Sequence, residues 1–389
     1  MEDYFARQEL VLKRETGDKI KSTRILVIGA GSGGNEVLKN LALMGFGYFT
    51  IIDFDTIEKS NLSRTTLFFK NDIGKSKSQT AAKSLRKITL HDNPEITGID
   101  AKIQDIGKQV FLEHDIVICC VDTMDARAYI NDWCVLLNKP FFEMGFDRFT
   151  IQISFFPNES TQDSCLRELI GYSDFSGTRQ SCSKLKIKDN ELEHIPTIQV
   201  AAAFAGVFVA TEVILYLQNE SKLKNSLLQY AAKHHNVLVI NIPQKPDCPM
   251  HENVKIEIHK SSLTSEKTYK DVLTELREEH KRDFYIKWGD EYIYSMNCEE
   301  CGKSLLIRKF KSNVFDNERW CKSCIDLNAY KEVPVQAKWK KTSELNLFNP
   351  NHVFFLNLSM SDFGVQNKDI ILAHDINSNK NKILVLLNI

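Results

Sequence analysis

The chain has 389 residues, a length that suits about two or three domains. Hydrophobic residues make up 43% of it and charged residues 26%, as in a globular protein with a sizeable core. The 50 basic and 51 acidic residues leave a formal net charge of −1. This balance excludes a chain-wide basic surface, so we expect no nucleic-acid partner.

The sequence is typical of a cytoplasmic protein. Residues 1–17 are charged and mixed, without the apolar segment of a secretory signal. Residues 196–217 are apolar over nearly the length of a membrane span, but Gln199, Thr211 and Glu212 interrupt them. We therefore expect a buried core helix and no membrane association. The cysteines are scattered, which favours metal or thiol chemistry over a disulfide framework.

The N-terminal part alternates between strand and helix patterns. A strand, a glycine-rich turn, a helix and a second strand within about 30 residues predict a Rossmann-like unit. The alternation continues beyond it, so we expect an α/β domain over residues 1–247, with a mainly parallel sheet covered by helices on both faces. Strands are expected at 24–28, 48–53, 97–101, 115–121 and 140–144, and helices at 1–24, 35–44, 126–137 and 196–217.

A cluster of three prolines, at positions 243, 246 and 249, marks the predicted boundary to a smaller α+β domain at residues 248–389. In this second domain the patterns predict strands at 254–259, 353–358 and 382–387, and a helix at 269–279.

Two C-x-x-C pairs lie within residues 296–326, separated by 19 residues. Such pairs place four thiolates tetrahedrally around Zn²⁺, as in a zinc ribbon, and Gly302 suits the tight turn after the first pair. We predict a closed structural zinc site; a redox pair, the alternative, would leave the second pair unexplained. The predicted ligands are Cys298, Cys301, Cys321 and Cys324.

The turn after the first strand contains the pattern G-x-G-x-x-G. Its first glycine allows a tight turn, and its second lets backbone N–H groups approach phosphate oxygens at a helix N-terminus. Asp53 ends the second strand, where a carboxylate accepts ribose hydroxyls. These features predict a nucleotide site but leave NAD and ATP open. The glycines are Gly29, Gly31, Gly33 and Gly34.

The polar residues that follow favour ATP. Asn61, Arg64 and Lys77 come shortly after the second strand. The pyrophosphate of a nicotinamide cofactor is served by backbone amides, whereas a triphosphate carries about four negative charges and takes amide, Arg and Lys donors. An NAD-dependent oxidoreductase would have no use for Lys77. A solvated polar loop would explain any one of these residues, but not the set.

The run D-x-D-x-I-x-x-S-N-L-x-R, which includes Asp53 and Asp55 and is followed by G-x-x-K, resembles the adenylating domain of ubiquitin-activating enzymes and of the bacterial ThiF/MoeB/HesA group. The resemblance covers about residues 4–247. It implies ATP-dependent adenylation of the C-terminal carboxylate of a ubiquitin-like protein or peptide ending in glycine, with release of pyrophosphate. Asp53 would hold the ribose, and Asn61, Arg64 and Lys77 the phosphates.

The resemblance also implies a magnesium ion and a dimer. Asp122 matches the family's magnesium-associated aspartate at a strand end, with Met124 where the family has asparagine. Arg7 matches an N-terminal arginine that reaches into the partner subunit's ATP site. The implied enzyme is a homodimer with shared active sites.

Relatives that go beyond adenylation carry a cysteine nucleophile ahead of the long apolar helix, and Cys182 has that place here. A thiolate accepts an acyl adenylate, and nearby cations lower the pKa of the thiol. A non-catalytic loop thiol is the alternative, and Cys165 is the rival nucleophile. A peptide- or sulfur-carrier-modifying enzyme without a thioester step is the second interpretation of the chain, and an inactive nucleotide-binding scaffold the third.

Relatives often hold zinc through two C-x-x-C pairs in the adenylating domain. This chain has Cys165 without a second cysteine in its pair, and Cys248 with His251 in place of one. Three ligands with no evident fourth predict a degenerate, empty site. The second domain is vaguely similar to the ubiquitin-fold appendage of larger activating enzymes, which implies that it recruits a conjugating enzyme.

Overall fold

The computed structural model describes residues 4–171, 198–246, 248, 250–251, 255–298, 301–310, 337–365 and 369–387. The chain divides into two compact units. The first comprises Met1–Ile106 and Val110–Glu252, and the second Gly107–Gln109 and Asn253–Ile389.

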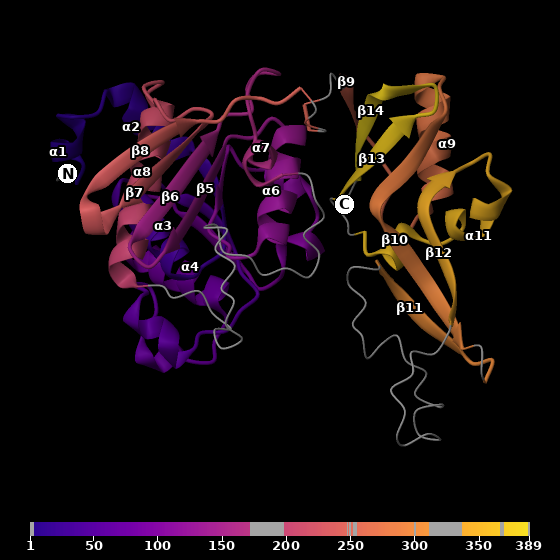
Figure 1. Cartoon of the computed structure of the whole chain (residues 1–389), viewed down its shortest axis with the longest axis horizontal. Helices are drawn as coiled ribbons and strands as arrows, with labels where there is room; N and C mark the ends of the chain where they lie inside the picture. Colours follow the sequence, from indigo (N-terminus) through magenta and orange to yellow (C-terminus); the bar gives the residue numbers. More distant parts are fainter. Residues whose placement is uncertain are drawn as a thin grey trace. The chain divides into compact units, whose positions relative to one another are not determined.

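An eight-stranded sheet forms the centre of the first unit (Figure 1), in the order β3-β2-β1-β4-β5-β6-β7-β8. Neighbours from β3 to β5 are parallel, and β6, β7 and β8 continue antiparallel. The sheet is therefore mixed, which corrects the mainly parallel prediction: β5 and β6 are joined by a tight turn rather than by a helical crossover. The strands are β1 (Arg24–Ile28), β2 (Tyr48–Ile52), β3 (Glu95–Ile99), β4 (Ile116–Cys119), β5 (Phe141–Asp147), β6 (Thr150–Phe156), β7 (Ser226–Ala231) and β8 (Asn236–Asn241).

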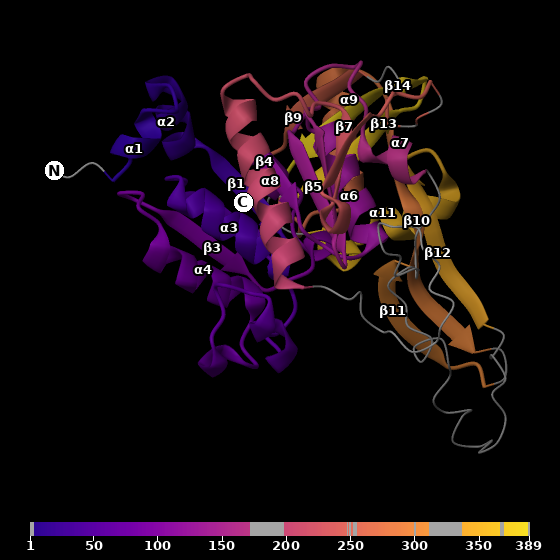
Figure 2. The ribbon, with the colours of Figure 1, turned by 60° about the vertical axis from the view of Figure 1, so that its left-hand side comes forward.

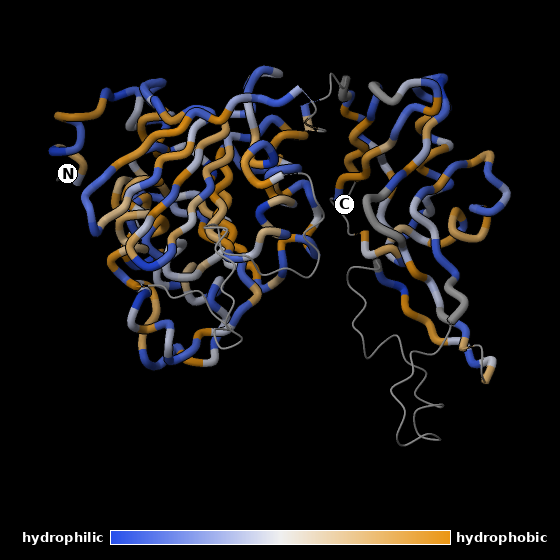
Figure 3. Tube along the Cα trace, in the orientation of Figure 1, coloured by the Kyte–Doolittle hydropathy of each residue, from blue (hydrophilic) through white to orange (hydrophobic). Residues whose placement is uncertain are grey.

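Apolar residues follow the central strands of this sheet (Figure 3), and helices pack on them. The helices α3 and α8 lie against each other (Figure 2). A Cβ at Gly206 of α8 would lie 2.5 Å from the Cβ of Glu36 in α3, so this spacing requires glycine. The helices are α1 (Ala6–Glu9), α2 (Arg14–Ser22), α3 (Ser32–Leu43), α4 (Lys77–Ile88), α5 (Gln109–Leu112), α6 (Met124–Leu136), α7 (Leu166–Ile170) and α8 (Gln199–Leu217).

The single helix predicted for residues 1–24 is two helices. The short α1 buries no residue, whereas α2 buries Thr16 and Ile20. Leu10 and Val11, between them, are exposed. Helical stability in proteins comes mostly from packing one face of the helix on other residues. The longer helix is therefore α2, which packs on the core, and α1, which does not, is short.

By length and composition, the helix α8 is long and apolar enough to cross a membrane. No other helix in the described part of the chain is. One side of it packs on α3, β5 and β6 and buries Ala201 to Val213 at helical spacing. Val200, Phe204 and Val207 are exposed. The helix, which we predicted to be a buried core helix, is therefore buried on one side and exposed on the other.

The second unit contains a six-stranded sheet with the order β11-β10-β13-β14-β9, and β12 pairs with β10. Only β14 and β9 are parallel among these described pairs. The helix α9 (Tyr269–His280) contributes Tyr269, Val272 and Leu276 to the core of this unit. The strands are β9 (Lys255–Lys260), β10 (Phe284–Cys298), β11 (Ser304–Phe310), β12 (Ala337–Asn346), β13 (Ile370–Asp375) and β14 (Ser378–Leu386).

The strand predicted at residues 353–358 is wrong. Val353–Leu356 forms the short helix α11, and Phe355 and Leu356 are buried in the core of the second unit. A brief apolar run does not distinguish a strand from a buried helical turn, so only the packing partners decide.

Candidate active site

The glycine turn joins the end of β1 to the N-terminus of α3. Gly29 has φ of +97°, and a Cβ there would lie 2.6 Å from the carbonyl oxygen of Cys120. A Cβ at Gly34 would lie 2.1 Å from the carbonyl oxygen of Gly29, so both positions require glycine. At Gly31 no atom beyond its chain neighbours lies within 4 Å of the Cβ position. The approach to the helix N-terminus, which an anion needs, is therefore open at Gly31.

Asp53 ties this turn to the end of β2. Its Oδ2 accepts a hydrogen bond from the amide of Ala30 at 2.6 Å, and its Oδ1 accepts one from the amide of Asp55 at 2.8 Å. Burial raises the pKa of Asp53, although Lys77 and the two amides act in the opposite direction. Each carboxylate oxygen keeps capacity for a second donor, so Asp53 can shape the turn and still accept a ribose hydroxyl.

Lys77 forms an ion pair beside this carboxylate. Its Nζ lies 2.7 Å from Oδ2 of Asp55, and its amide donates to the Asp55 carbonyl oxygen at 3.0 Å. Lys77 is the first residue of α4, and its side chain is only 13% exposed. These contacts hold an ammonium group next to the glycine turn, where an incoming phosphate would compete with Asp55 for it.

Asn61 and Arg64 come from the short 3₁₀ helix η1 (Lys59–Ser63) and the residue after it. Asn61 is buried, and its Oδ1 accepts a hydrogen bond from the amide of Glu58 at 2.9 Å. Arg64 is half-buried and makes no ion pair with any residue that the structure describes. Its guanidinium is therefore available to an anionic ligand.

The fully buried Asn35 connects the glycine turn to the loop after η1, a role that was not predicted from the sequence. Its Nδ2 donates to the carbonyl oxygens of Ala30 and Gly31 at 2.8 and 3.0 Å, and its Oδ1 accepts from the amide of Leu67 at 2.9 Å. An asparagine one turn into the helix gives no sign of this by itself, because its partner Leu67 is distant in sequence.

Asp122 lies just beyond the end of β4, beside the glycine turn. The amide of Cys120 donates to the carbonyl oxygen of Ile28 at 2.7 Å, so the two chain segments run next to each other here. The Asp122 side chain is exposed.

A buried arginine fixes the segment that carries Asp122. Arg127 of α6 is ion-paired with Glu143 of β5, and it donates hydrogen bonds to the carbonyl oxygens of Val121 and Met144. Gly33, in the first turn of α3, faces the Met144 side chain. The role of Arg127 was not predicted either, because nothing distinguishes an arginine in a helix from a surface residue until its partners are known.

Arg7 is not near this turn within its own chain. It lies on α1, where the neighbouring Gln8 donates from Nε2 to the carbonyl oxygen of Met44 at 3.0 Å, at the C-terminal end of α3. Gly31 caps the opposite end, and a helix of 12 residues is about 18 Å long. Arg7 is exposed, so its predicted role requires a second chain.

The predicted nucleophile Cys182 lies outside the described residues. The rival Cys165 is fully buried. Burial, together with Glu168, raises the pKa of its thiol far above the usual range. A nucleophilic cysteine needs an accessible thiolate, so Cys165 does not suit that role.

The first cysteine pair of the predicted zinc ribbon lies in the turn between β10 and β11. The amide of Gly302 donates to the Cys298 carbonyl oxygen at 2.9 Å, and the amide of Cys298 donates to the Lys303 carbonyl oxygen at 3.0 Å. Gly302 has φ of +70°, as the predicted tight turn requires. Cys321 and Cys324, the second pair, lie outside the described residues.

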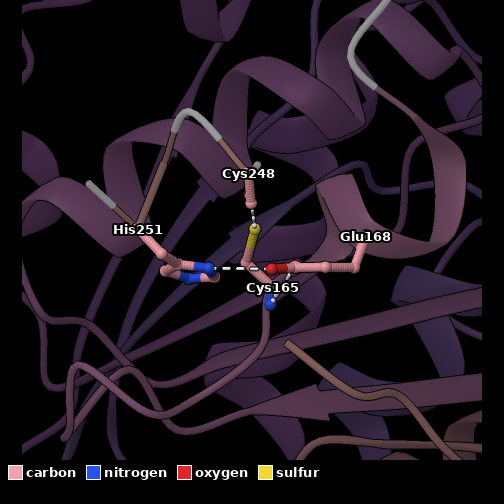
Figure 4. Close-up of side chains that lie close together, drawn as sticks. All are labelled: Cys165, Glu168, Cys248 and His251. Atoms are coloured by element: carbon pink, nitrogen blue, oxygen red, sulfur yellow. Dashed lines mark hydrogen bonds and ion pairs between the residues drawn. The ribbon is translucent and has the colours of Figure 1, made fainter. Parts of the chain in front are cut away.

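A buried cluster of four potential metal ligands is formed by Cys165, Glu168, Cys248 and His251 (Figure 4). The expected absence of a fourth ligand is therefore wrong, because α7 brings Glu168 back to the cysteine at its N-terminus. Glu168 Oε1 lies 2.8 Å from His251 Nδ1, but without the angle of a hydrogen bond. Burial disfavours the Glu168 carboxylate, yet the contacts with His251 and Cys165 lower its pKa to about 2.

The four groups fit a tetrahedral zinc ion. Zinc–sulfur bonds of about 2.3 Å place two thiolates about 3.8 Å apart, and the Sγ atoms of Cys165 and Cys248 lie 4.0 Å apart. Thiolate, imidazole and carboxylate are all groups that zinc accepts. Four protein ligands would leave no open position, so a metal here would be structural.

The parallel strands around β1, with a glycine turn at the N-terminus of α3 and with Asp53 and the Lys77–Asp55 pair beside it, give the first unit a Rossmann-like α/β fold. The model of the ThiF family matches residues 5–250, and the chain belongs to this family. Among curated proteins it is 40% identical over 143 residues to SUMO-activating enzyme subunit 2 of Dictyostelium discoideum (37% of this chain, 22% of that protein). It is 42% identical over 117 residues to the NEDD8-activating enzyme E1 catalytic subunit of Caenorhabditis elegans (30% and 27%).

Solved structures show the same fold. A crystal structure of E. coli MccB with MccA-N7isoASN has a TM-score of 0.55 at 21% identity, covering 65% of this chain and 76% of that one. Another, of E. coli MccB with ATP, has a TM-score of 0.53 at 21% identity, covering 64% and 75%. The chain spans less than a third of the length of the two curated relatives.

Proposed function

We propose that the chain is an ATP-dependent adenylyltransferase that activates the C-terminal carboxylate of a ubiquitin-like protein or a peptide. The observation that carries this proposal is an open glycine turn fixed by Asp53, with the Lys77–Asp55 ion pair beside it. The names of the relatives support it, since they include SUMO- and NEDD8-activating enzymes and an MccB structure with ATP.

The reaction would form a bond between a carboxylate oxygen and the α-phosphorus of ATP, and break the bond to the pyrophosphate leaving group. The carboxylate is already ionised at pH 7, so no general base is needed. Catalysis then depends on positioning and on stabilising the charge of the phosphates. Arg64 and Lys77 supply fixed positive charge, and Asp122 would hold the Mg²⁺ that neutralises the phosphate oxygens.

The acceptor chemistry allows two versions of this function. In the first, a ubiquitin-like protein passes from the adenylate to Cys182 as a thioester, and the second unit recruits a conjugating enzyme. In the second, a peptide or sulfur carrier is modified without a thioester. Sequence identity to the SUMO- and NEDD8-activating enzymes favours the first.

A homodimer is part of the proposal. Val200, Phe204 and Val207 of α8 are exposed, and so is the apolar edge strand β8, where Val237 and Val239 are 53% and 54% exposed. Apolar surfaces of this kind favour burial against another chain, and an unpaired edge strand favours pairing. A second copy would also supply the Arg7 that each glycine turn lacks from its own chain.

We further propose structural zinc at the buried cluster of Cys165, Glu168, Cys248 and His251, and at the ribbon that includes Cys298 and Cys301. A cytoplasmic location, where cysteines stay reduced, suits the cysteine ligands proposed for both sites.

Pyrophosphate exchange into ATP tests the adenylation. The assay would contain Mg²⁺ and a panel of small proteins and peptides ending in glycine. We expect exchange that depends on one member of the panel and that is lost in Lys77→Ala. Lys75→Ala is the matched control, because Lys75 is two residues away, 56% exposed and paired with Asp72. Equal exchange in Lys77→Ala and wild type, or binding of NAD instead of ATP, would contradict the proposal.

A further inference from the structure

Two histidines of the second unit lie together where the strand β9 faces the C-terminal end of α9. His259 of β9 is 4% exposed, and His280 is the last residue of α9. Their ring centroids are 5.5 Å apart. His259, Glu279 and His280 each offer a ligand atom, and these atoms all lie within 4.8 Å of one another.

The contacts of His259 divide its two ring nitrogens between two carboxylates. Its Nε2 lies 2.7 Å from Oε1 of Glu275, and its Nδ1 lies 3.3 Å from Oε2 of Glu279. A metal-bound histidine has one nitrogen on the metal and donates the other N–H to a carboxylate, which fixes the ring. Glu275 is placed for that supporting role, and Nδ1 and Glu279 for the metal.

The two ring nitrogens of His280 also differ in their surroundings. Its Nδ1 lies 3.7 Å from Oε2 of Glu257, so a carboxylate faces one side of the ring. Its Nε2 is buried and has no hydrogen-bond partner. Buried polar atoms without a partner are rare in folded proteins, and a ring nitrogen in this state can be satisfied by a metal ion.

More carboxylates than basic side chains surround the two histidine rings, which favours binding of a cation. Three carboxylates, of Glu257, Glu275 and Glu279, face them. Arg282 pairs with Glu257 and with Asp375, which leaves Glu275 and Glu279 without a basic partner other than His259 among the described residues. These two are also spaced i, i+4 on one helix, where like charges repel.

We propose that His259, Glu279 and His280 bind a divalent metal ion of the zinc class, with Glu275 and Glu257 as supporting carboxylates. Two imidazoles and a carboxylate are a ligand set that zinc takes with a fourth position open. The Glu279 side chain is 61% exposed, so the ion faces solvent, and its fourth ligand is water. The ion clamps the end of α9 to β9. This site does not depend on the proposed adenylation.

A network of ion pairs around a protonated His259 is the competing explanation. It accounts for Glu275 and Glu279, but it leaves Nε2 of His280 buried and unpaired. The two explanations differ in what the full-length chain does with a metal ion.

Cobalt(II) titration of the zinc-loaded full-length protein tests the site. Cobalt bound by nitrogen and oxygen gives weak d–d absorption without the sulfur-to-cobalt charge-transfer bands of thiolate sites, so this site is distinguishable from the cysteine clusters. Because purified protein can retain zinc here, the total metal content of each variant is measured in parallel. At this histidine site we expect one metal ion per chain, in addition to the zinc of the cysteine sites. It is either taken up as cobalt or already present as zinc.

The variants separate ligands from neighbours. Glu279→Gln and His280→Asn should each weaken binding at least about 10-fold, and Glu275→Gln should weaken it by about 10-fold through the ring of His259. Glu278→Gln, at an exposed neighbouring position of α9, should leave binding unchanged. Circular dichroism checks that each variant is folded. The same metal content and cobalt spectrum in wild type, Glu279→Gln and Glu278→Gln would overturn the proposal in favour of the ion-pair network.

Discussion

The amide of Ala30 donates a 2.6 Å hydrogen bond to the carboxylate of Asp53. This bond joins the glycine turn after the first strand to the end of the second. The other carboxylate oxygen accepts from the amide of Asp55, so one side chain orients the turn together with the residue that pairs with Lys77. The proposed nucleotide binding and the local stability are therefore coupled at Asp53.

Asp53→Asn should affect both properties. The amide group of asparagine cannot accept on both sides, so one backbone donor loses its partner, at a cost of about 1–3 kcal/mol. We expect a lower denaturation midpoint and an ATP dissociation constant raised about 10-fold or more, measured by urea unfolding and calorimetry. Asp92→Asn, at an exposed position, is the control. Unchanged ATP binding in Asp53→Asn would show that the carboxylate does not contribute to the nucleotide site.

Two glycines of the turn should respond differently to alanine. A Cβ at Gly34 meets a carbonyl oxygen at 2.1 Å, so Gly34→Ala should destabilise the first unit by about 1–3 kcal/mol. Gly31 has φ of −69° and an open Cβ position, so Gly31→Ala should leave stability unchanged and weaken ATP binding. Thermal unfolding and calorimetry on the two variants check this. An unstable Gly31→Ala protein would contradict the assignment of Gly31 to ligand approach.

The glycines, Asp53 and Lys77 were named from the sequence, but the residues that support them were not. The glycines and Asp53 directly follow the ends of β1 and β2, so a local sequence pattern predicts where they lie. Lys77 begins α4, and its place was implied by the family resemblance. Asn35 and Arg127 act through partners that only the folded sheet brings near. Glu168 was missed for a related reason: a carboxylate is an ordinary surface residue until α7 places it beside Cys165.

The same distinction applies to the fold. The first five strands follow from alternating apolar runs and helices. The antiparallel β6 and β7 were not predicted. β6 follows β5 after only Arg148 and Phe149, so no glycine or helix signal separates these two strands. Whether an apolar run forms a strand or a helical turn, as at Phe355, depends on which residues cover it.

Cys248→Ser should release zinc from the buried cluster of the first unit. One thiolate ligand is lost, and Cys165, Glu168 and His251 stay in place. We expect one equivalent less zinc per chain by mass spectrometry, and a lower melting temperature, because metal bound only by the folded state stabilises it. Cys134→Ser, at a buried cysteine outside the cluster, controls for the loss of a thiol. Equal zinc in both variants would contradict a metal site at Cys248.

His114 should make the first unit less stable in mild acid. Burial lowers the pKa of this ring below its ordinary value of 6.5, and its two nitrogens contact the Val110 carbonyl oxygen and the Thr50 hydroxyl. The unfolded chain then binds the proton first, so the stabilisation is complete above pH 6.5 and declines as the pH falls below it. Urea unfolding between about pH 7.5 and 5.5 measures the decline, following the fluorescence of the first unit. His114→Gln, which keeps a donor and an acceptor, should flatten this dependence; an equally steep one would assign it to other groups.

Mixing two inactive variants tests the shared site. Arg7 lies at the far end of α3 from the glycine turn of its own chain, so we expect Arg7→Ala and Lys77→Ala each to abolish pyrophosphate exchange. In a mixed dimer, the Lys77→Ala chain still donates Arg7 to the intact turn of the Arg7→Ala chain. Random mixing gives mixed dimers in half of the population with one working site each, so about a quarter of wild-type activity should return. The subunits must exchange for this to occur, which native mass spectrometry of tagged and untagged chains checks. No recovery after complete exchange would mean that Arg7 does not act across a dimer.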